Sequence, residues 1–298
     1  MEEYKNIPLT NQSPNEGYPL PGYNNNQVFP VMAPIFGGIS YQYIQDPMDE
    51  LESSRKVLIR QKPQFIEQMF GCESANRYYV FSESPQQGVK LLFKCKEFSS
   101  CWMRNCCPAN NRAFKMDIKH IANAYNFNDD FSIPFLKINR PYKCACCCCC
   151  RPEMFINLGS NNQFLGRIVQ PFQCCDPKFL LYNNDGLLRY MIHADCCQCG
   201  LCCANSCCGK LSKAVFNIYK GADINTISGT IIKRPAKSGE ELFTNADSYE
   251  IQFPINDITV EDKILLIVAG LMIDYQYFEQ SPVDKNHPTI QLGGYRNY

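Results

Sequence analysis

The sequence lacks any surplus of charge, because its 29 basic and 29 acidic residues cancel and neither sign forms a long run. A protein that binds a nucleic acid duplex concentrates positive charge against the phosphates. We therefore expect no nucleic acid partner. Histidine is scarce, with three in 298 residues, and no Ser-His-Asp set, P-loop or paired-cysteine redox motif stands out. We expect no covalent catalysis, so the chain is not predicted to be an enzyme.

Long apolar runs are also missing. The start, MEEYKNIPLTNQ, is acidic and asparagine-rich, without the basic head and apolar stretch of a secretory signal, so we expect a cytosolic chain. Residues 264–273 form an apolar run of ten, about half of the roughly twenty that span a bilayer as a helix. Asp274 follows and would cost about 3 kcal/mol near a membrane centre. A helix buried inside the protein is the simpler interpretation, and membrane insertion stays the alternative.

The first 50 residues are rich in proline, asparagine and tyrosine and have too little periodic apolar content to build a core. We predict a disordered leader over 1–50. It has no P-x-x-P spacing for adaptor docking, and self-association or adaptor binding through it stays open. The folded domain is predicted over 51–280, followed by a C-terminal tail over 281–298.

Short strand-like runs separated by turn residues fill the chain from residue 56. Phe114, Met116 and Ile118 alternate with charged residues, and Asp185-Gly186 predicts a hairpin. The predicted strands are 56–61, 76–82, 88–97, 112–120, 135–140, 154–159, 164–172, 178–183, 187–193, 214–220, 225–234 and 249–255. About twelve strands predict a mostly β fold, a single antiparallel barrel or sandwich.

One helix is predicted at the end of this β domain, over 259–278. Thr259 and Asp262 have the spacing of a capping box ahead of the apolar run. The residues of this helix that would contact a membrane or the core are Ile264, Leu265, Leu266, Ile267, Val268, Leu271 and Ile273.

Most of the twenty cysteines gather at 101–107, 144–150, 173–176 and 196–208, and Cys146 to Cys150 are consecutive. A reducing cytosol and the poor geometry of adjacent cysteines argue against a disulfide framework. Cys196, Cys199 and Cys202 have C-x-x-C spacings that suit zinc, yet the cluster is nearly continuous and has no histidine. A cysteine-rich metal protein stays an alternative, but zinc over 196–208 is not expected.

S-acylation suits the consecutive cysteines better, because five successive side chains cannot all face one ion. Arg140, Lys143 and Arg151 flank the run, and their charges favour an anionic cytoplasmic leaflet. One acyl chain holds a protein only marginally, so adjacent thiols supply the two or more chains that stable anchoring needs. An unmodified cysteine-rich loop is the alternative.

Six segments together resemble the phospholipid scramblase family in order and approximate spacing over residues 40–280: GCESANRYYV, RNCCPANNRAF, RPYKCACCCCC, GRIVQPFQCCDPKF, NADSYEIQFPIND and KILLIVAGLMIDYQYFE. The resemblance implies a tubby-like closed antiparallel β-barrel of about twelve strands around the C-terminal helix. It also implies a palmitoylated anchor, which falls here on Cys146, Cys147, Cys148, Cys149 and Cys150. The chain would then lie at the cytoplasmic face of a membrane, expected to be the plasma membrane.

The same resemblance implies a calcium-binding loop before the final helix, with acidic first, third and twelfth positions. Those positions are Asn245, Asp247 and Asn256 here. Because calcium affinity falls as ligand charge is removed, we expect weak binding, or none at physiological calcium levels. The candidate ligands are Asn245, Asp247, Tyr249, Ile251, Phe253, Asn256 and Asp257.

Two functions follow from the resemblance and the cysteine run. The first is a membrane-anchored scramblase that moves phospholipids between leaflets without energy input, with calcium as its trigger. The second is a palmitoylated lipid-binding or scaffold protein without transport activity. The placement of residues 264–278 separates them, because a lipid-exposed helix favours transport and a helix enclosed by strands favours the scaffold.

Overall fold

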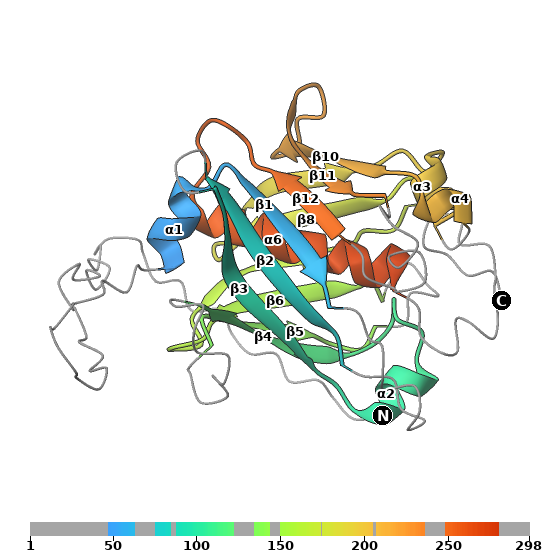
Figure 1. Cartoon of the computed structure of the whole chain (residues 1–298), viewed down its shortest axis with the longest axis horizontal. Helices are drawn as coiled ribbons and strands as arrows, with labels where there is room; N and C mark the ends of the chain where they lie inside the picture. The colour runs from blue at the N-terminus through green and yellow to red at the C-terminus, as the bar shows by residue number, and fades with distance from the viewer. Residues whose placement is uncertain are drawn as a thin grey trace, which may run out of the picture. The chain divides into compact units, whose positions relative to one another are not determined.

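A computed structural model describes residues 47–62, 75–84, 88–121, 134–143, 150–173, 175–204, 207–235 and 248–279 (Figure 1). The chain divides into two units, 1–44 and 45–298, and the described residues all belong to the second. The predicted leader lies outside the described residues up to residue 46, as does the predicted tail. The helix α1 (Pro47–Ser53) begins inside the predicted leader, so the folded part starts slightly earlier than we expected.

Twelve strands form a closed barrel in which each strand pairs with its sequence neighbour and β1 pairs with β12. They are β1 (Lys56–Gln61), β2 (Arg77–Ser84), β3 (Gly88–Phe98), β4 (Phe114–His120), β5 (Leu136–Arg140), β6 (Glu153–Leu158), β7 (Phe164–Val169), β8 (Lys178–Asn183), β9 (Leu188–His193), β10 (Ala214–Lys220), β11 (Ile227–Lys233) and β12 (Ser248–Gln252). Each predicted strand therefore corresponds to an observed one, and the prediction of a closed antiparallel barrel is confirmed.

The barrel has two different ends, because successive antiparallel strands place their connections alternately at one end and the other. We call one the cysteine end; it holds the connections β1–β2, β3–β4, β5–β6, β7–β8, β9–β10 and β11–β12. Short helices lie there: α2 (Cys101–Cys106), α3 (Cys199–Cys202) and α4 (Cys207–Lys210), on the right in Figure 1. The other, which we call the opposite end, holds α1, the remaining connections and the start of the final helix.

The helix α6 (Val260–Ile273) runs inside the barrel from the opposite end and continues as a π-helical turn, η2 (Asp274–Phe278). Thr259 and Asp262 form the predicted capping box. Every residue from Asp262 to Phe278 is buried, including all seven predicted as helix contacts. Gly270 allows close packing, since a Cβ there would lie 3.1 Å from side-chain atoms of Ile59 and Ile251. The apolar run is therefore the centre of the hydrophobic core.

Charged side chains fix the start of α6. Arg189 donates to both carboxyl oxygens of Asp262, at 3.0 and 2.8 Å, beside the cap at Thr259. The Lys263 ammonium group donates to the carbonyls of Leu51, Glu52 and Ser54 at 2.7–3.0 Å. These carbonyls lie at the C-terminal end of α1, so the Lys263 ammonium group of α6 caps that helix. Burial lowers the pKa of Lys263.

Candidate functional site

The cysteine clusters meet at one end of the barrel although they are scattered along the chain. Among the described cysteines, Cys95 alone lies in a strand, where it is buried. All the others belong to four connections of the cysteine end, β3–β4, β5–β6, β7–β8 and β9–β10. The sequence already indicated that the clusters share one end of a barrel, because they follow every second predicted strand.

The predicted acylation run lies in the β5–β6 connection. Cys150 is exposed, while Cys146 to Cys149 fall outside the described residues. Arg151 donates to the carbonyl of Gln170 at 3.3 Å, and Lys143 forms an ion pair with Glu153 at 3.0 Å. Two of the three predicted flanking cations, Lys143 and Arg151, are partly exposed, and Arg151 follows Cys150 directly in the chain.

Arg140 corrects the sequence interpretation, because it is buried and cannot present its charge to a membrane surface. It donates to the carbonyls of Ala109 and Asn110 and lies over the rings of Phe114 and Tyr275, at 5.5 and 5.6 Å. Burial lowers the pKa of Arg140 to about 10. Its position at the end of β5, where the strand alternation points inward, explains this role.

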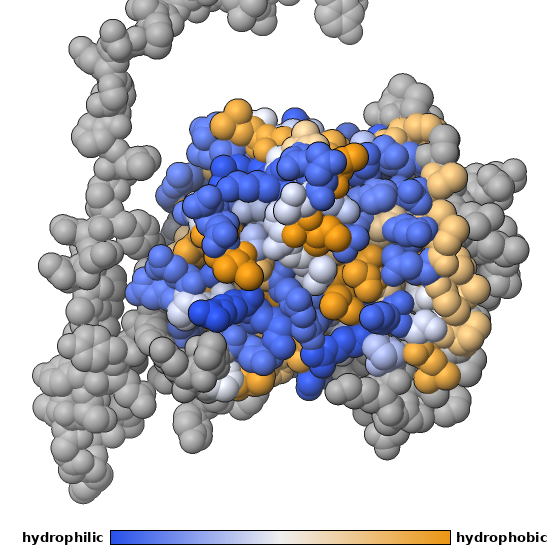
Figure 2. All heavy atoms as spheres, turned by 90° about the horizontal axis from the view of Figure 1, so that it is seen from above, coloured by the Kyte–Doolittle hydropathy of each residue, from blue (hydrophilic) through white to orange (hydrophobic). Residues whose placement is uncertain are grey.

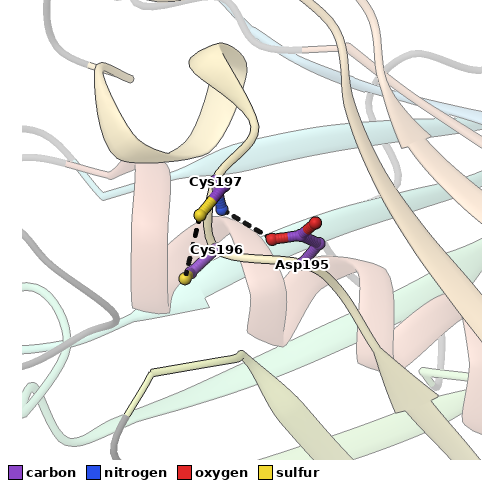
Figure 3. A group of neighbouring side chains, drawn as sticks. All are labelled: Asp195, Cys196 and Cys197. Atoms are coloured by element: carbon purple, nitrogen blue, oxygen red, sulfur yellow. Dashed lines mark hydrogen bonds between the residues drawn. The ribbon is translucent and has the colours of Figure 1, made fainter.

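The cysteines over 196–208 form a compact loop on β10. The Gln198 side chain accepts from the backbone N–H of Val215 at 2.7 Å and donates to its carbonyl at 2.9 Å. Figure 3 shows the thiols of Cys196 and Cys197 side by side, 3.9 Å apart, while the Asp195 carboxylate accepts from the Cys197 N–H at 2.8 Å. The ligand atoms of these three residues lie within 4.8 Å of one another.

Two thiols of this loop, those of Cys196 and Cys203, hold their protons more tightly than a free cysteine does. A hydrogen bond with Asp176 raises the pKa of Cys196 to about 12, and a hydrogen bond with Cys202 raises the pKa of Cys203 to about 11. Zinc binds the thiolate, so at these two positions it would have to displace a proton that is held more tightly than at an ordinary cysteine. The expectation that zinc is not bound at 196–208 stays a prediction.

Disulfides need one correction. Eleven described cysteines carry free thiols, as expected for a reducing environment, but Cys101 at the start of α2 is disulfide-bonded. Neither a reducing compartment nor the poor geometry of adjacent cysteines predicts this disulfide.

The candidate calcium ligands do not converge among the described residues. Tyr249 and Ile251 lie in β12, paired with β1 and β11, and their side chains are buried, as is that of Phe253. Asn256 and Asp257 are exposed in the turn before α6, and Asp257 forms an ion pair with Lys220 at 3.3 Å. Five extended residues rise roughly 13–17 Å, much farther than the few ångströms across one ion's ligand shell. Asn245 and Asp247 lie outside the described residues.

A polar network surrounds the end of the enclosed helix. The Asp274 carboxyl group accepts from the hydroxyls of Tyr78 at 2.6 Å and Tyr249 at 2.5 Å. The Tyr275 hydroxyl donates to Glu97 at 2.7 Å, and Glu97 also accepts from the Asn76 N–H at 3.0 Å. Asp274, which argued against a membrane span, is therefore satisfied inside the protein. Tyr249, a candidate calcium ligand, takes part in this network through its side chain.

Sequence reasoning missed this network because its partners are distant in the sequence. Asp274 and Tyr78 are separated by 196 positions and Tyr275 and Glu97 by 178. Among the described residues, we find no helix with both the length and the hydropathy to cross a bilayer.

Comparison with known proteins places these features in a family context. The scramblase family model matches residues 39–280. Phospholipid scramblase 1 of Homo sapiens is 28% identical over 236 residues, covering 78% of this chain and 66% of that protein. Phospholipid scramblase 2 of Bos taurus is 29% identical over 238 residues, covering 78% and 72%. Phospholipid scramblase 4 of Homo sapiens is 26% identical over 314 residues, covering 94% and 87%. The matched chain spans slightly less than two thirds of the length of the phospholipid scramblase 1 relatives.

Proposed function

We propose that this chain, which belongs to the scramblase family, is a membrane-anchored phospholipid scramblase that moves phospholipids between the two leaflets in both directions without energy input. The observation that carries the proposal is the family match over residues 39–280, which includes the whole barrel and its helix. The proposal involves lipid translocation and no covalent catalysis. Its substrate is the phospholipid membrane itself.

The proposed anchor is S-palmitoylation of Cys146 to Cys150 at the cytoplasmic face of the plasma membrane. The exposure of Cys150 at the cysteine end, beside the cations Lys143 and Arg151, supports it. Replacing all five cysteines by alanine is expected to move the protein from the membrane to the soluble fraction of fractionated cells. Unchanged membrane association, with hydroxylamine-sensitive acylation lost, would contradict this anchor.

Calcium triggering is proposed as a weak effect. The neutral amides of Asn245 and Asn256 reduce the ligand charge. In the sequence, β12 lies between the pair Asn245 and Asp247 and the pair Asn256 and Asp257. A calcium site would therefore form either from one of these pairs alone or after rearrangement of β12. Asp247→Ala is expected to abolish any calcium-dependent change in tyrosine and Trp102 fluorescence, with Asp223→Ala, an exposed aspartate of another loop, as the matched control.

The second candidate function is a palmitoylated lipid-binding or scaffold protein without transport activity. The enclosed position of α6 favours it, because a helix surrounded by twelve strands offers no surface to lipid. Translocation requires a path that lowers the cost of moving a polar headgroup through hydrocarbon. Under the scramblase proposal, the surface of the barrel or its rearrangement must supply that path in place of α6.

The deciding experiment is lipid translocation by purified, palmitoylated protein reconstituted in vesicles that carry a fluorescent phospholipid. Dithionite reduces only outer-leaflet fluorophores, so a scramblase makes the protected inner fraction accessible. We expect that loss of protection, somewhat faster with calcium, and no calcium effect in Asp247→Ala. Full protection by folded, vesicle-bound protein would reject the scramblase and leave the scaffold.

A further inference from the structure

The loop that joins β9 to β10 presents its thiols in adjacent pairs. In the first pair, the Sγ atoms of Cys196 and Cys197 lie 3.9 Å apart, and in the second pair those of Cys202 and Cys203 lie 3.7 Å apart. All four side chains are partly or fully exposed. Each pair therefore offers two sulfur atoms that are already in contact and that a solute can reach.

The backbone of this loop is held in place by close packing. A Cβ at Gly200 would lie 2.4 Å from the carbonyl oxygen of Lys213, and a Cβ at Gly209 would lie 1.8 Å from the carbonyl oxygen of Cys203. Leu201 and Ala204 are buried in the hydrophobic core. Because these small and apolar residues face inward, the thiols of the two pairs are left at the surface on a fixed backbone.

More sulfur surrounds the second pair. A hydrogen bond with Cys202 raises the pKa of Cys203, and the charges of Cys199 in α3 and Cys208 in α4 raise it further. Since the interaction of two charges falls with distance, these thiols lie near the second pair. Figure 2 shows a band of moderately hydrophobic side chains along the right-hand end, where Figure 1 places α3 and α4.

Paired thiols suit monovalent copper better than zinc. Thiolates select soft ions, and monovalent copper accepts a pair of them, whereas structural zinc takes four ligands in a tetrahedron. In the described part of the chain, the largest set of candidate ligand atoms within 4.8 Å of one another has three members, Asp195, Cys196 and Cys197. The tightly held protons of Cys196 and Cys203 also favour an ion with a high affinity for thiolate, because binding must displace them.

We propose that the β9–β10 loop is a binding site for monovalent copper, with one ion held by each pair of adjacent cysteines. Two sulfur atoms in contact reach one ion through rotation of their side chains, while the backbone stays in place. Each thiol that binds the ion releases its proton to water. Cys199 and Cys208 supply further thiols beside the second pair, so we expect that pair to bind the tighter ion. The proposal is independent of lipid translocation and of the acyl anchor.

The test is a titration of full-length protein with monovalent copper under nitrogen, in competition with bathocuproine disulfonate, a chelator that is coloured when it binds this ion. The protein is measured as it is and with alanine in place of Cys146 to Cys150, because consecutive thiols of that run also bind copper. In both forms we expect the loop to withhold two equivalents of copper from the chelator. Zinc, added in the same way against the chelator 4-(2-pyridylazo)resorcinol, should not be withheld.

Matched variants locate the copper. Serine at both cysteines of the second pair should remove the tighter of the two equivalents, and serine at both cysteines of the first pair should remove the weaker one. The control is Cys106→Ser combined with Cys175→Ser, which removes two exposed thiols from other connections of the cysteine end. This control should withhold both equivalents, and circular dichroism checks that each variant is folded.

Three results would overturn the proposal: transfer of all copper to the chelator, an equal loss of copper in the control and in the pair variants, or zinc held as firmly as copper. If a pair variant does not fold, protein with both pairs intact decides the question. Copper should then protect both pairs from N-ethylmaleimide, while Cys106 and Cys175 react, as read by peptide mass spectrometry. Labelling of both pairs in copper-loaded protein would also reject the site.

Discussion

Two apolar regions of this protein have opposite fates. The helix α6 is the most hydrophobic segment of the sequence, and it is enclosed by the barrel with every residue of its apolar run buried. Four aromatic side chains at the cysteine end are isolated from one another in the sequence, and they are exposed: Phe98, Trp102, Tyr142 and Phe172. The difference shows that the most hydrophobic segment of this chain forms its core, whereas isolated aromatic side chains supply part of its exposed apolar surface.

The largest effect tests whether α6 is core. Leu266→Ala is expected to lower the free energy of unfolding by about 3–5 kcal/mol, because it leaves a cavity in a fully buried site. Leu187→Ala, at an exposed position, should change it by less than about 0.5 kcal/mol. Urea unfolding followed by circular dichroism measures both. Equal, small effects would mean that α6 does not pack in the core in solution.

Alkaline pH tests the polar network at the end of the same helix. Burial raises the pKa of Tyr78 and of Tyr275 well above 10. Both phenols then stay protonated in the folded protein at a pH where they ionise in the unfolded chain. Stability is therefore full below about pH 10 and falls above it, by about 1.4 kcal/mol per pH unit for each tyrosine. Tyr78→Phe should make this fall shallower by the share of one tyrosine, about 1.4 kcal/mol per pH unit; an unchanged slope would contradict the assignment.

Asp274→Ala is expected to cost about 2 kcal/mol, because it leaves the hydroxyls of Tyr78 and Tyr249 buried without their acceptor. A double-mutant cycle with Tyr249→Phe isolates the contact, since the two losses should not add when the groups interact. Additive losses in urea unfolding would show that the carboxyl and Tyr249 do not interact.

The smallest effect concerns the reactivity of the cysteine end. The high pKa of Cys196, about 12, means that little thiolate exists at neutral pH and that its alkylation rate keeps rising with pH up to that range. Asp176→Asn removes the carboxylate that raises this pKa and should speed alkylation by iodoacetamide near neutral pH, measured by peptide mass spectrometry. Cys95 is buried and serves as the unreactive control. An unchanged rate of Cys196 alkylation in the variant would show that Asp176 does not raise the pKa of Cys196.

Local patterns predicted the fold well because the signals that define a strand, a turn or a helix start lie within a few neighbouring residues. The alternation of Phe114, Met116 and Ile118 places all three inside, and the Asp185-Gly186 turn joins β8 and β9, with Gly186 at φ 77°. The capping residues Thr259 and Asp262 also act locally. Such signals depend on neighbours a few positions away, which one sequence displays directly.

The site was less predictable because it depends on which distant segments meet. Arg140 looked like a surface cation, but its partners at Ala109 and Asn110 become visible only when β4 and β5 pair. The location of the described cysteine connections at one end of the barrel likewise appears only when alternate connections are sorted by strand direction.

The pairing of β1 with β12 has a consequence for how the chain is made. The barrel cannot close, and Lys263 cannot reach the carbonyl of Leu51 212 positions earlier, until the last helix has left the ribosome. During synthesis the earlier strands must therefore wait as an open sheet with its apolar inner face exposed. Folding should be slow, since most contacts join distant segments, and a nascent chain that stalls before α6 would be a substrate for chaperones.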